Sequence, residues 1–375
     1  MQRTVLLQLV RGFGALLLGM QAGLGYLSVQ ADGLALQPHV EVLEKVSFRR
    51  VAGGAAQGAC LDVGPAGSWY RGTVGMPTVH FDGMIYRMWF VGDEPTKDPR
   101  APYRIYERIG LAVSPDGIHW EVANHGQPVL DLGPPGSADA KGLAHPYVLK
   151  VGDQFWMWYG GIDGKLAGDL GLTPASVRIE RICLATSADG IHWKRANGGK
   201  PVLDIGPKGA SDSIQATGMH ILKIGDEFKM WYGAYGNQRH TLMMATSPDG
   251  IHWTRYNNGE PITGLVGGGQ GQLGASVYFD GKRYFMLYGG DLGQQWRTYS
   301  AVSDDGFHFK QRHEGSPILK PAPAGNFDTA GPGRNHVAHP TQFVVTNRKV
   351  RIWYLGEDGS PPHLQRIGLM EATLP

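Results

Sequence analysis

The stretch AVSPDGIHW at residues 112–120 recurs along the chain and decides the fold. It returns as ATSADGIHW at 185–193 and ATSPDGIHW at 245–253, and more weakly as AVSDDGFHF at 301–309. The four serines of these copies, Ser114, Ser187, Ser247 and Ser303, lie 73, 60 and 56 residues apart. Self-similarity at this spacing indicates one supersecondary unit that is used repeatedly.

A second marker precedes each copy and occurs once more near the C-terminus. It consists of an apolar strand, a turn and a strand that ends in an aromatic pair. Its five copies read FDGMIYRMWF (81–90), VGDQFWMWYGG (151–161), IGDEFKMWYGA (224–234), FDGKRYFMLYGG (279–290) and TNRKVRIWYLG (346–356). Asp-Gly pairs between such strands are typical of tight hairpin turns. Each unit therefore reads as four antiparallel strands, which is the blade of a β-propeller.

The two ends of the chain complete the last unit. That unit stops at Arg366–Met370 with a third strand, and Val46–Phe48 resembles the start of the missing fourth strand. The segment 59–62 then takes the place that 128–131 has in the second unit. A ring closed in this way leaves no open sheet edge. We predict an all-β protein with a single five-bladed propeller of four-stranded antiparallel blades over residues 40–375.

Composition supports a compact chain of strands and turns. Glycine supplies 56 of 375 residues, about twice its usual share, yet 42% of the chain is hydrophobic, which excludes a disordered sequence. A net charge of +2, without a run of five basic residues, argues against a nucleic-acid partner. Cys60 and Cys183 both fall in predicted strands, where we expect buried thiols, with a single bridge as the alternative.

Residues 1–31 have the pattern of a secretory signal peptide. Arg3 and Arg11 precede an uncharged stretch at 12–27, and Val29-Gln30-Ala31 fits a signal peptidase site. The sequence therefore predicts an exported protein, periplasmic or extracellular, with an uncleaved N-terminal anchor as the alternative. No other segment approaches 18 apolar residues, so we expect no membrane span in the mature domain. We also predict a monomer.

Five units with Ser-x-Asp-Gly-x-x-Trp hairpins and Met-Trp-Tyr-Gly-Gly strand ends resemble the five-bladed propeller glycosidases of families 43, 32, 62, 68 and 130. The resemblance covers residues 40–375, and the hairpin is also similar to the Asp-box of sialidases. Family 43 implies three catalytic acids on the innermost strands of the first three blades. Here those strands begin with Met76-Pro77, His145-Pro146 and Met219-His220, so no acid stands at the usual positions.

Two other sets of acids are candidates for the chemistry. Asp139, Asp212 and Asp328 precede innermost strands, and we predict them as catalytic carboxylates, with local loop hydrogen bonds as the alternative. The second set follows the aromatic strand ends, where exposed turn acids are the alternative: Asp93-Glu94, Asp163, Asp291 and Glu357-Asp358. The hairpin aspartates, such as Asp116, are expected to cap their own turns.

Basic and aromatic side chains supply candidate substrate contacts. A recurrent arginine, at 108, 181, 297 and 366, can pair with the recurrent acids or grip a ligand. Four aromatics interrupt the repeat, are expected in loops, and suit stacking on a sugar ring. The predicted substrate-binding residues are Trp69, Tyr70, His145, Arg181, Tyr235, Asp291, Trp296, His339 and Glu357.

Histidines expected near the propeller axis raise the question of a central metal ion. His145 and His339 stand at the start of innermost strands, with His220 and His336 nearby. The resemblance to family 43 permits a central calcium ion there, but no cofactor is required and we predict no metal ligand. Buried, hydrogen-bonded histidines are the alternative.

Three functions compete on this reading. The first is an exported glycoside hydrolase that acts on an oligo- or polysaccharide at the central channel with a pair of carboxylates. The second is a non-catalytic propeller that binds a glycan or a protein, because the usual innermost acids are missing. The third, implied by the resemblance to family 130, is a phosphorylase. The predicted partner is a carbohydrate ligand.

Overall fold

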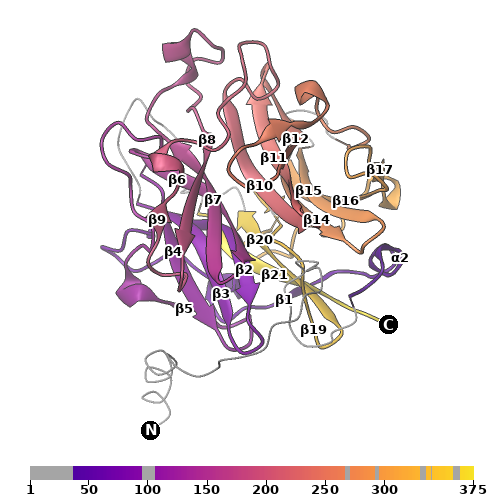
Figure 1. The fold of residues 1–375 in the computed structure, drawn as a ribbon. Coiled ribbons are helices and arrows are strands. Elements are labelled where there is room, and N and C mark those ends of the chain that lie inside the picture. The colour runs from indigo at the N-terminus through magenta and orange to yellow at the C-terminus, as the bar shows by residue number, and fades with distance from the viewer. Residues whose placement is uncertain are drawn as a thin grey trace, which may run out of the picture.

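The chain folds into five antiparallel sheets arranged in a ring, as the computed structural model shows (Figure 1). The structure describes residues 37–94, 106–266, 271–291, 295–329, 335–338, 340–357 and 364–375, with the backbone alone at 335–338. The predicted signal peptide lies outside these residues. None of the helices in the described ranges is long and apolar enough to cross a membrane.

The first three blades are separate four-stranded sheets. Their strands, from the inner to the outer edge, are β2 (Thr73–Phe81), β3 (Tyr86–Asp93), β4 (Arg108–Ser114) and β5 (Glu121–Val122) in blade 1, and β6 (Gly142–Val151), β7 (Gln154–Ile162), β8 (Arg181–Ser187) and β9 (Lys194–Arg195) in blade 2. Blade 3 consists of β10 (Gln215–Ile224), β11 (Glu227–Gly236), β12 (Arg239–Ser247) and β13 (Thr254–Arg255).

The last two blades are joined into one nine-stranded sheet. Blade 4 contains β14 (Gln272–Phe279), β15 (Tyr284–Asp291), β16 (Gln295–Ser303) and β17 (Lys310–Gln311). In blade 5 the inner strand is split into β18 (Asn335–Ala338) and β19 (Val344–Thr346), followed by β20 (Lys349–Glu357), β21 (Arg366–Thr373) and β1 (Arg49–Val51). The sheets merge because β16 pairs with β18 in parallel.

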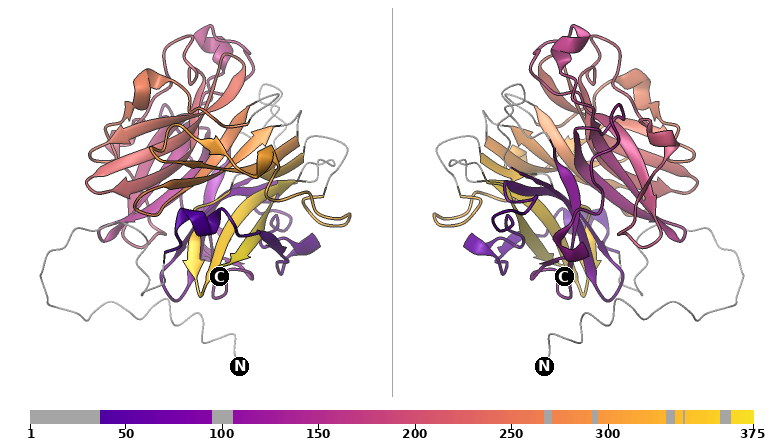
Figure 2. Two further views of the ribbon diagram at one scale, coloured as in Figure 1. Left: turned by 90° about the vertical axis from the view of Figure 1, so that its right-hand side faces the viewer. Right: turned by 90° about the vertical axis from the view of Figure 1, so that its left-hand side faces the viewer.

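Helices are short and lie outside the blades. A four-residue helix, α2 (Val40–Leu43), packs its two buried side chains against the core of blades 4 and 5, and Figure 2 shows it beside the yellow strands. Single 3-10 turns make up the rest: η1 (Ala56–Gly58), η2 (Asn124–Gly126), η3 (Ala167–Leu170), η4 (Asn197–Gly199), η5 (Tyr256–Gly259) and η6 (His313–Gly315).

The N-terminal segment closes the ring, as predicted. Strand β1 pairs with β21, with Arg49 opposite Glu371. Leu61 then forms an isolated bridge with Ile367, which repeats the bridge between Leu130 and Ile109 at the end of blade 1. The fourth strand of the last blade therefore comes from the start of the chain. The predicted five-bladed propeller is confirmed.

Each repeated hairpin fastens its blade to the preceding one. Within a hairpin the aspartate caps its own turn, as Asp249 does by accepting the backbone N–H groups of Ile251 and His252. The hairpin glycine offers its carbonyl to the indole of the neighbouring blade, in the pairs Trp89–Gly190, Trp158–Gly250, Trp231–Gly306 and Trp353–Gly117. Blade 4 carries Leu287 at the tryptophan position, because the blade that follows takes its fourth strand from the N-terminus and has no such hairpin.

Backbone contacts also join the blades at one end of the ring, where the inner strands begin. Here the residue before the repeated arginine of the third strand, or before Thr241 in blade 3, meets the inner strand of the next blade. Its carbonyl accepts the N–H of Leu143, Ala216 and Val74 at three of the junctions. At the other two, the contacts are a parallel bridge and the β16–β18 pairing. We call this end of the propeller the mouth, and we call the five residues the mouth ring: Glu107, Glu180, His240, Trp296 and Gln365.

Candidate active site at the mouth of the propeller

An axial cavity lies among the inner strands of all five blades. It is small, about 40 Å³, and is open to solvent, and Met76, Pro77, Pro146 and Met219 are among its lining residues. Polar groups come from His145, His220, Thr341 and Gln342. Polar groups that converge among apolar side chains are a feature of ligand sites, although a volume of this size holds only about one or two water molecules.

The inner strands reach the cavity through a β-bulge. The register of β6 against β7 shifts between Ala144 and Tyr147, and the same shift occurs in β2 between Gly75 and Thr78. At the bulge His145 and Met76 each have a φ of +48°, a left-handed conformation that Gly218 and Gly274 adopt in the next two blades. A non-glycine residue with such a φ is strained, and strain of this kind gathers at functional sites. The bulge places the His145 side chain at the axis.

The described lining of the cavity does not fit a calcium ion. Calcium prefers carboxylate and carbonyl oxygens, whereas the lining offers two imidazoles and no carboxylate. Burial lowers the pKa of His220 to about 3, and its ring lies 4.7 Å from that of Tyr147, so His220 is a neutral packed side chain. His339 lies outside the described residues.

A buried ion cluster adjoins the cavity. The guanidinium of Arg178 lies 2.8 Å from a carboxylate oxygen of Glu107 and 2.6 Å from one of Glu180. The two glutamates belong to neighbouring blades at the same position of the mouth ring, and both are buried. Gln215, at the start of β10, donates to Glu180 and to the carbonyl of Arg178, so the cluster joins three blades.

An insertion in blade 2 carries Arg178 to this position. Between β7 and β8 the chain makes an excursion through η3, whereas β11 and β12 in blade 3 are joined by a tight turn. The excursion packs its own Ala167 and Ile179 against Ile214 of the crossover into blade 3. This small core fixes the base of the excursion and therefore the guanidinium that follows it.

Glu180 and His145 influence each other's protonation. Burial lowers the pKa of His145 to about 4, against an opposing effect of the Glu180 charge, so its imidazole is neutral near pH 7. Burial alone would raise the pKa of Glu180, but Arg178, His145 and Thr217 together outweigh it and the pKa lies below its usual value. A β-carbon on Gly160 would lie 2.6 Å from Thr217 and 3.3 Å from Glu180, so a glycine there leaves room for the carboxylate. Glu180 is thus an ionised group next to the cavity.

Further acids stand opposite the mouth ring on the ends of the second strands. Asp93, Asp291 and Glu357 are all buried, which contradicts the alternative that the acids of this set are exposed turn residues. Asp291 lies opposite Trp296, and Glu357 accepts a hydrogen bond from Gln365 at 3.0 Å. Glu94 is exposed, and Asp163 lies beside Arg181 at 3.0 Å. Five buried carboxylates therefore share one rim of the molecule.

The three aspartates predicted as catalytic occupy a different kind of site. The Asp139 carboxylate accepts hydrogen bonds from the Tyr159 hydroxyl at 2.8 Å and from Nε of Arg195 at 2.7 Å. The same arrangement recurs as Asp212 with Tyr232 and Arg255, and as Asp328 with Tyr354 and Arg50. Among the described contacts none joins two of these aspartates. Each cluster holds the crossover that enters a blade against that blade's own strands.

In blade 1 the equivalent site is filled by apolar groups. Trp69 and Tyr70, two of the aromatics predicted to contact the substrate, are part of it. Tyr70 stands where blades 2, 3 and 5 have the aspartate, Phe90 where they have the tyrosine, and Val122 where they have the arginine. Trp69 stacks on Phe90 with ring centroids 5.8 Å apart and donates to the carbonyl of Gly126. Trp69 and Tyr70 do lie in a loop, as predicted, and both are half-buried.

The other two aromatics do not lie in loops. Trp296 is fully buried in β16, and Tyr235 lies in β11, with its ring 4.5 Å from that of His240. The prediction that they lie in loops was wrong, because the second and third strands of blades 3 and 4 extend past the repeat as far as the mouth. Tyr235 remains partly exposed there.

The recurrent arginines pair with acids of the crossovers. Arg181, predicted as a substrate contact, lies 2.7 Å from Asp204, and Arg108 and Arg366 contact Asp131 and Asp62 in the same way. Arg297 is the exception, because Lys320 stands where the other crossovers have the acid. The guanidinium of Arg297 instead donates to the carbonyl of Trp296.

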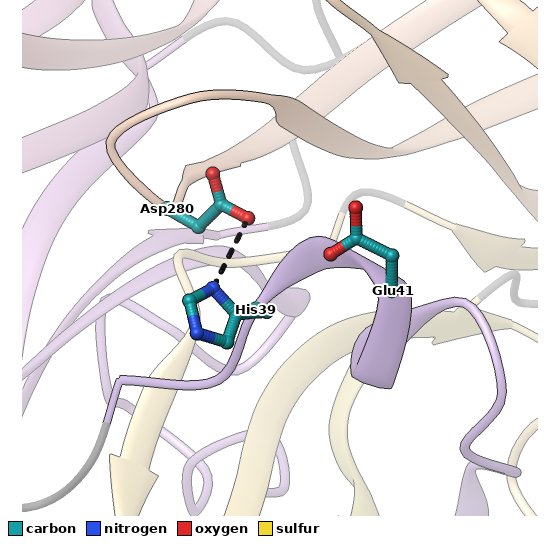
Figure 3. A group of neighbouring side chains, drawn as sticks. All are labelled: His39, Glu41 and Asp280. Atoms are coloured by element: carbon teal, nitrogen blue, oxygen red, sulfur yellow. Dashed lines mark ion pairs between the residues drawn. The ribbon is translucent and has the colours of Figure 1, made fainter.

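A group of three side chains that could bind a metal ion lies where α2 meets blade 4, outside the mouth. Figure 3 shows His39 facing Asp280, with Glu41 on the adjacent turn. The Asp280 carboxylate is already used by the backbone N–H of Val40 and those of its own turn, and Glu41 pairs with Arg283. These contacts dock the N-terminal segment.

The sequence analysis missed Glu107, Arg178 and Glu180. Glu107 and Glu180 each stand directly before a repeated arginine, so an alignment of the third strands would have found this pair. Arg178 lies in the long connection between β7 and β8, where an Arg-Ile pair that also occurs before Glu107, at 104–105, is the one weak sequence signal. The geometry alone reveals that it joins the two glutamates.

Known proteins resemble this chain in sequence over about half of its length. No protein-family model matches the chain. It is 29% identical over 187 residues to the uncharacterized protein Rv1502 of Mycobacterium tuberculosis, which is 49% of this chain and 56% of that protein. It is 31% identical over 180 residues to a 1,2-beta-oligomannan phosphorylase of Thermoanaerobacter sp. (strain X514), 44% of this chain and 53% of the relative. The chain thus spans about half the length of the curated relatives it matches.

Solved structures extend the likeness to most of the chain. One comes from the GH130 family of mannoside phosphorylases, which contains glycoside hydrolases that target beta-1,2 mannosidic linkages in Candida mannan. It has a TM-score of 0.63 at 17% identity and covers 88% of this chain and 96% of its own. A thermostable family-43 glycoside hydrolase has a TM-score of 0.57 at 16% identity, with 85% and 90% covered. The predicted resemblance is confirmed: the chain has the five-bladed propeller fold of these glycoside hydrolases and phosphorylases.

Proposed function

We propose that this protein cleaves glycosidic bonds of an oligo- or polysaccharide at the mouth of the propeller, with a pair of carboxylates. The observation that carries the proposal is the set of five buried acids on one rim, next to an axial cavity. Glycoside cleavage needs two carboxyl groups of opposite protonation, and environments that push their pKa values apart supply them. The likeness in fold to glycoside hydrolases supports the same chemistry, as an analogy.

The ionised carboxylate in this proposal is Glu180. It takes a proton from the attacking water or attacks the sugar itself, while a second acid protonates the oxygen of the leaving group. Asp93, Asp291 and Glu357 are the candidates for that proton donor, since they are buried carboxyl groups on the same rim. Asp139, Asp212 and Asp328 then serve to hold the crossovers, because each is taken up by a tyrosine and an arginine.

The substrate that we propose first is a beta-1,2-linked mannoside. One relative is a 1,2-beta-oligomannan phosphorylase, and one neighbour in fold comes from a family with hydrolases for beta-1,2 mannosidic linkages. Tyr235, exposed in part at the mouth, suits stacking on a sugar ring. If residues 1–31 act as a signal peptide, the enzyme meets this substrate outside the cytoplasm.

Phosphorolysis is the second candidate, favoured by the activity of the two Thermoanaerobacter relatives. We place hydrolysis first because of the charges at the mouth. Arg178 is paired with two carboxylates, and the buried acids Asp93, Asp291 and Glu357 lie on the same rim. Such a rim repels a phosphate anion and tolerates water.

The test is a cleavage assay on beta-1,2-mannobiose and longer oligomannosides, alongside arabinan, xylan and fructan oligosaccharides, with and without inorganic phosphate. We expect sugar release without phosphate, and a kcat lowered by about 100-fold or more in Glu180→Gln, the size of a lost acid or base. Asp131→Asn is the matched control, an exposed acid that pairs with Arg108.

Each other result has a meaning. A sugar phosphate formed only when phosphate is present would replace hydrolysis by phosphorolysis. Glycan binding without any product, in the wild type and every variant, would contradict the proposal and make the protein a binding propeller. Activity that survives Glu180→Gln would move the reacting pair to other acids.

A further inference from the structure

We propose that blade 4 carries a binding site for a carboxylate of the ligand at the mouth, formed by the guanidinium of Arg297 and the hydroxyl of Tyr299. The ligand class that fits is a glycan with an acidic sugar, such as a uronic acid. The inference rests on the proposed function in taking a glycan as the ligand, and it adds an acidic group to the substrate.

The first argument is a pairing that blade 4 has lost. In blades 1, 2 and 5 the repeated arginine of the third strand lies 2.6–2.7 Å from an aspartate at the end of that blade, in the pairs Arg108–Asp131, Arg181–Asp204 and Arg366–Asp62. In blade 4 the same position is Lys320. Within the described part of the chain, Arg297 donates to the carbonyl of Trp296 at 2.8 Å and to the amide oxygen of Gln295 at 3.5 Å, and neither group is a carboxylate.

The main chain around the lost partner is arranged as in the paired blades. Ile318 donates its N–H to the carbonyl of Thr298, and the guanidinium of Arg50 donates to the carbonyl of Lys320. Both bonds have counterparts at the same positions in blades 1 and 2. The site therefore keeps its backbone, and the side chain that would neutralise Arg297 is the part that has changed.

The position of the missing acid is open to solvent. Asp131 and Asp204 are 64% and 65% exposed, and Lys320 is exposed as well. Arg297 itself is 5% exposed. A carboxylate that approaches from outside therefore reaches the guanidinium from the side on which the paired blades place their aspartate.

The charge of Arg297 is not fully compensated within the fold. Burial, the largest cause, and the charge of Arg50 hold the pKa of Arg297 below its usual value, against the opposing effects of Tyr299 and Asp328. The Asp328 carboxylate is already bound by Arg50 and by Tyr354. A buried cation without a contacting anion is costly, and an anionic ligand would remove that cost.

Tyr299 supplies a second donor on the same face of β16. It stands where blades 1 and 5 have Gly110 and Gly368. Its side chain points to the same face as that of Arg297, because the two residues are two positions apart in the strand. The hydroxyl is buried and has no hydrogen-bond partner among the described residues. Buried donors are normally paired, so this hydroxyl and the guanidinium together suit one carboxylate.

The same comparison identifies the class of anion. A carboxylate is the group that three other blades place against this arginine, and the planar guanidinium matches it. The buried acids of the rim, such as Asp291, disfavour a free anion. A sugar that carries the carboxylate gains further contacts at the mouth, which a small free anion lacks.

The test compares the binding of oligosaccharides of mannuronic, glucuronic and galacturonic acid with that of their carboxyl-reduced counterparts, by calorimetry on the full-length protein. We expect at least one acidic oligosaccharide to bind at least about tenfold more tightly than its neutral counterpart, the size of one charge-assisted pair. Arg297→Gln should remove this preference. Lys320→Asp should remove it as well, because the introduced aspartate restores the pairing of the other blades and occupies the site.

Two variants serve as matched controls. Lys320→Asn removes the same surface cation without adding a carboxylate and should keep the preference. Arg108→Gln changes the equivalent arginine of blade 1, which already has its Asp131 partner, and should keep it too. The melting temperature of Lys320→Asp should be at or above that of wild type, since it neutralises a buried cation, so its lost preference does not come from a loss of the fold.

The outcomes separate the inference from the proposed function. Equal affinities of acidic and neutral probes for the wild type, or a preference that survives both Arg297→Gln and Lys320→Asp, would overturn the inference. Inorganic phosphate that binds in dependence on Arg297, with no preference among the sugars, would assign the site to free phosphate and would also overturn it. A preference for the acidic probes in a protein that cleaves no glycan supports the inference and contradicts the proposed function alone.

Discussion

The indole Nε1 of Trp353 donates a hydrogen bond of 3.0 Å to the carbonyl of Gly117, and this bond joins the last blade to the first. The two residues are separated by most of the chain, and the hairpin glycine has a φ of +74° that presents its carbonyl to the neighbouring blade. Three other blade junctions have the same bond, so the ring is closed by the contact that also propagates it.

Trp353→Phe tests this closure. The ring of phenylalanine keeps much of the buried area, and the Gly117 carbonyl keeps the indole of Trp120 as a donor. The lost bond should cost about 0.5–1.5 kcal/mol of unfolding free energy. Urea unfolding followed by tryptophan fluorescence measures the loss. Trp158→Phe, at an internal junction, is the control and should cost a similar amount. A Trp353→Phe variant as stable as wild type would show that the closing bond carries no free energy.

The Asp212 and Arg255 pair tests the structural reading of the three buried aspartates. Asp212→Asn leaves the guanidinium without its anion, 2.7 Å away, and we expect a loss of about 2–4 kcal/mol in unfolding free energy. A double-mutant cycle with Arg255→Met should give a coupling energy of at least about 1 kcal/mol. A fully stable Asp212→Asn variant with abolished cleavage would instead make this aspartate catalytic.

Stability should fall in acid through the hairpin aspartates. The backbone N–H and the imidazole of His252 hold the pKa of Asp249 well below its usual value. A depressed pKa in the folded state contributes stability above the unfolded value of about 3.9 and loses it as the pH falls below that value. Melting temperatures between pH 2 and 6 should drop less steeply in Asp249→Asn than in wild type. Parallel curves would mean that the capping bond is not linked to folding.

Tyr235 provides a test of sugar stacking at the mouth. Its ring contacts that of His240 and remains partly exposed, so Tyr235→Ala should raise KM by about tenfold with little change in kcat. Tyr256→Ala is the matched control, an exposed tyrosine packed on Phe307 at the outer edge of blade 3. Equal effects of the two substitutions would remove Tyr235 from the substrate site.

Both cysteines should be unreactive in the folded protein. Cys60 and Cys183 are buried free thiols, as the sequence favoured, and burial raises the pKa of Cys60 to about 12. Ellman's reagent should detect no thiol under native conditions and two in urea. Rapid modification of either cysteine without denaturant would contradict the burial. A count below two in urea, restored by reductant, would indicate a disulfide.

The sequence repeats predicted the fold because each repeated unit is a contiguous stretch of the chain, and its strands and turns are encoded within that stretch. The hairpin at 112–120, its three copies and the five aromatic strand ends fixed the number of blades and the order of strands within each. The need to bury every sheet edge then implied that β1 completes the last blade, as it does. Even the turn-capping aspartates followed from spacing, since they bond within their own hairpins.

The site could not be read in the same way, because its residues meet across blades. Asp139 looked catalytic beside an inner strand, and only packing showed the tyrosine and arginine that take up its carboxylate. Glu107 and Arg178 are far apart in sequence, and so are Glu107 and Glu180. The sequence by itself determined the propeller, since its pattern is periodic. Tertiary structure alone decided which charges are buried together at the mouth, because burial and charge pairing depend on neighbours from other blades.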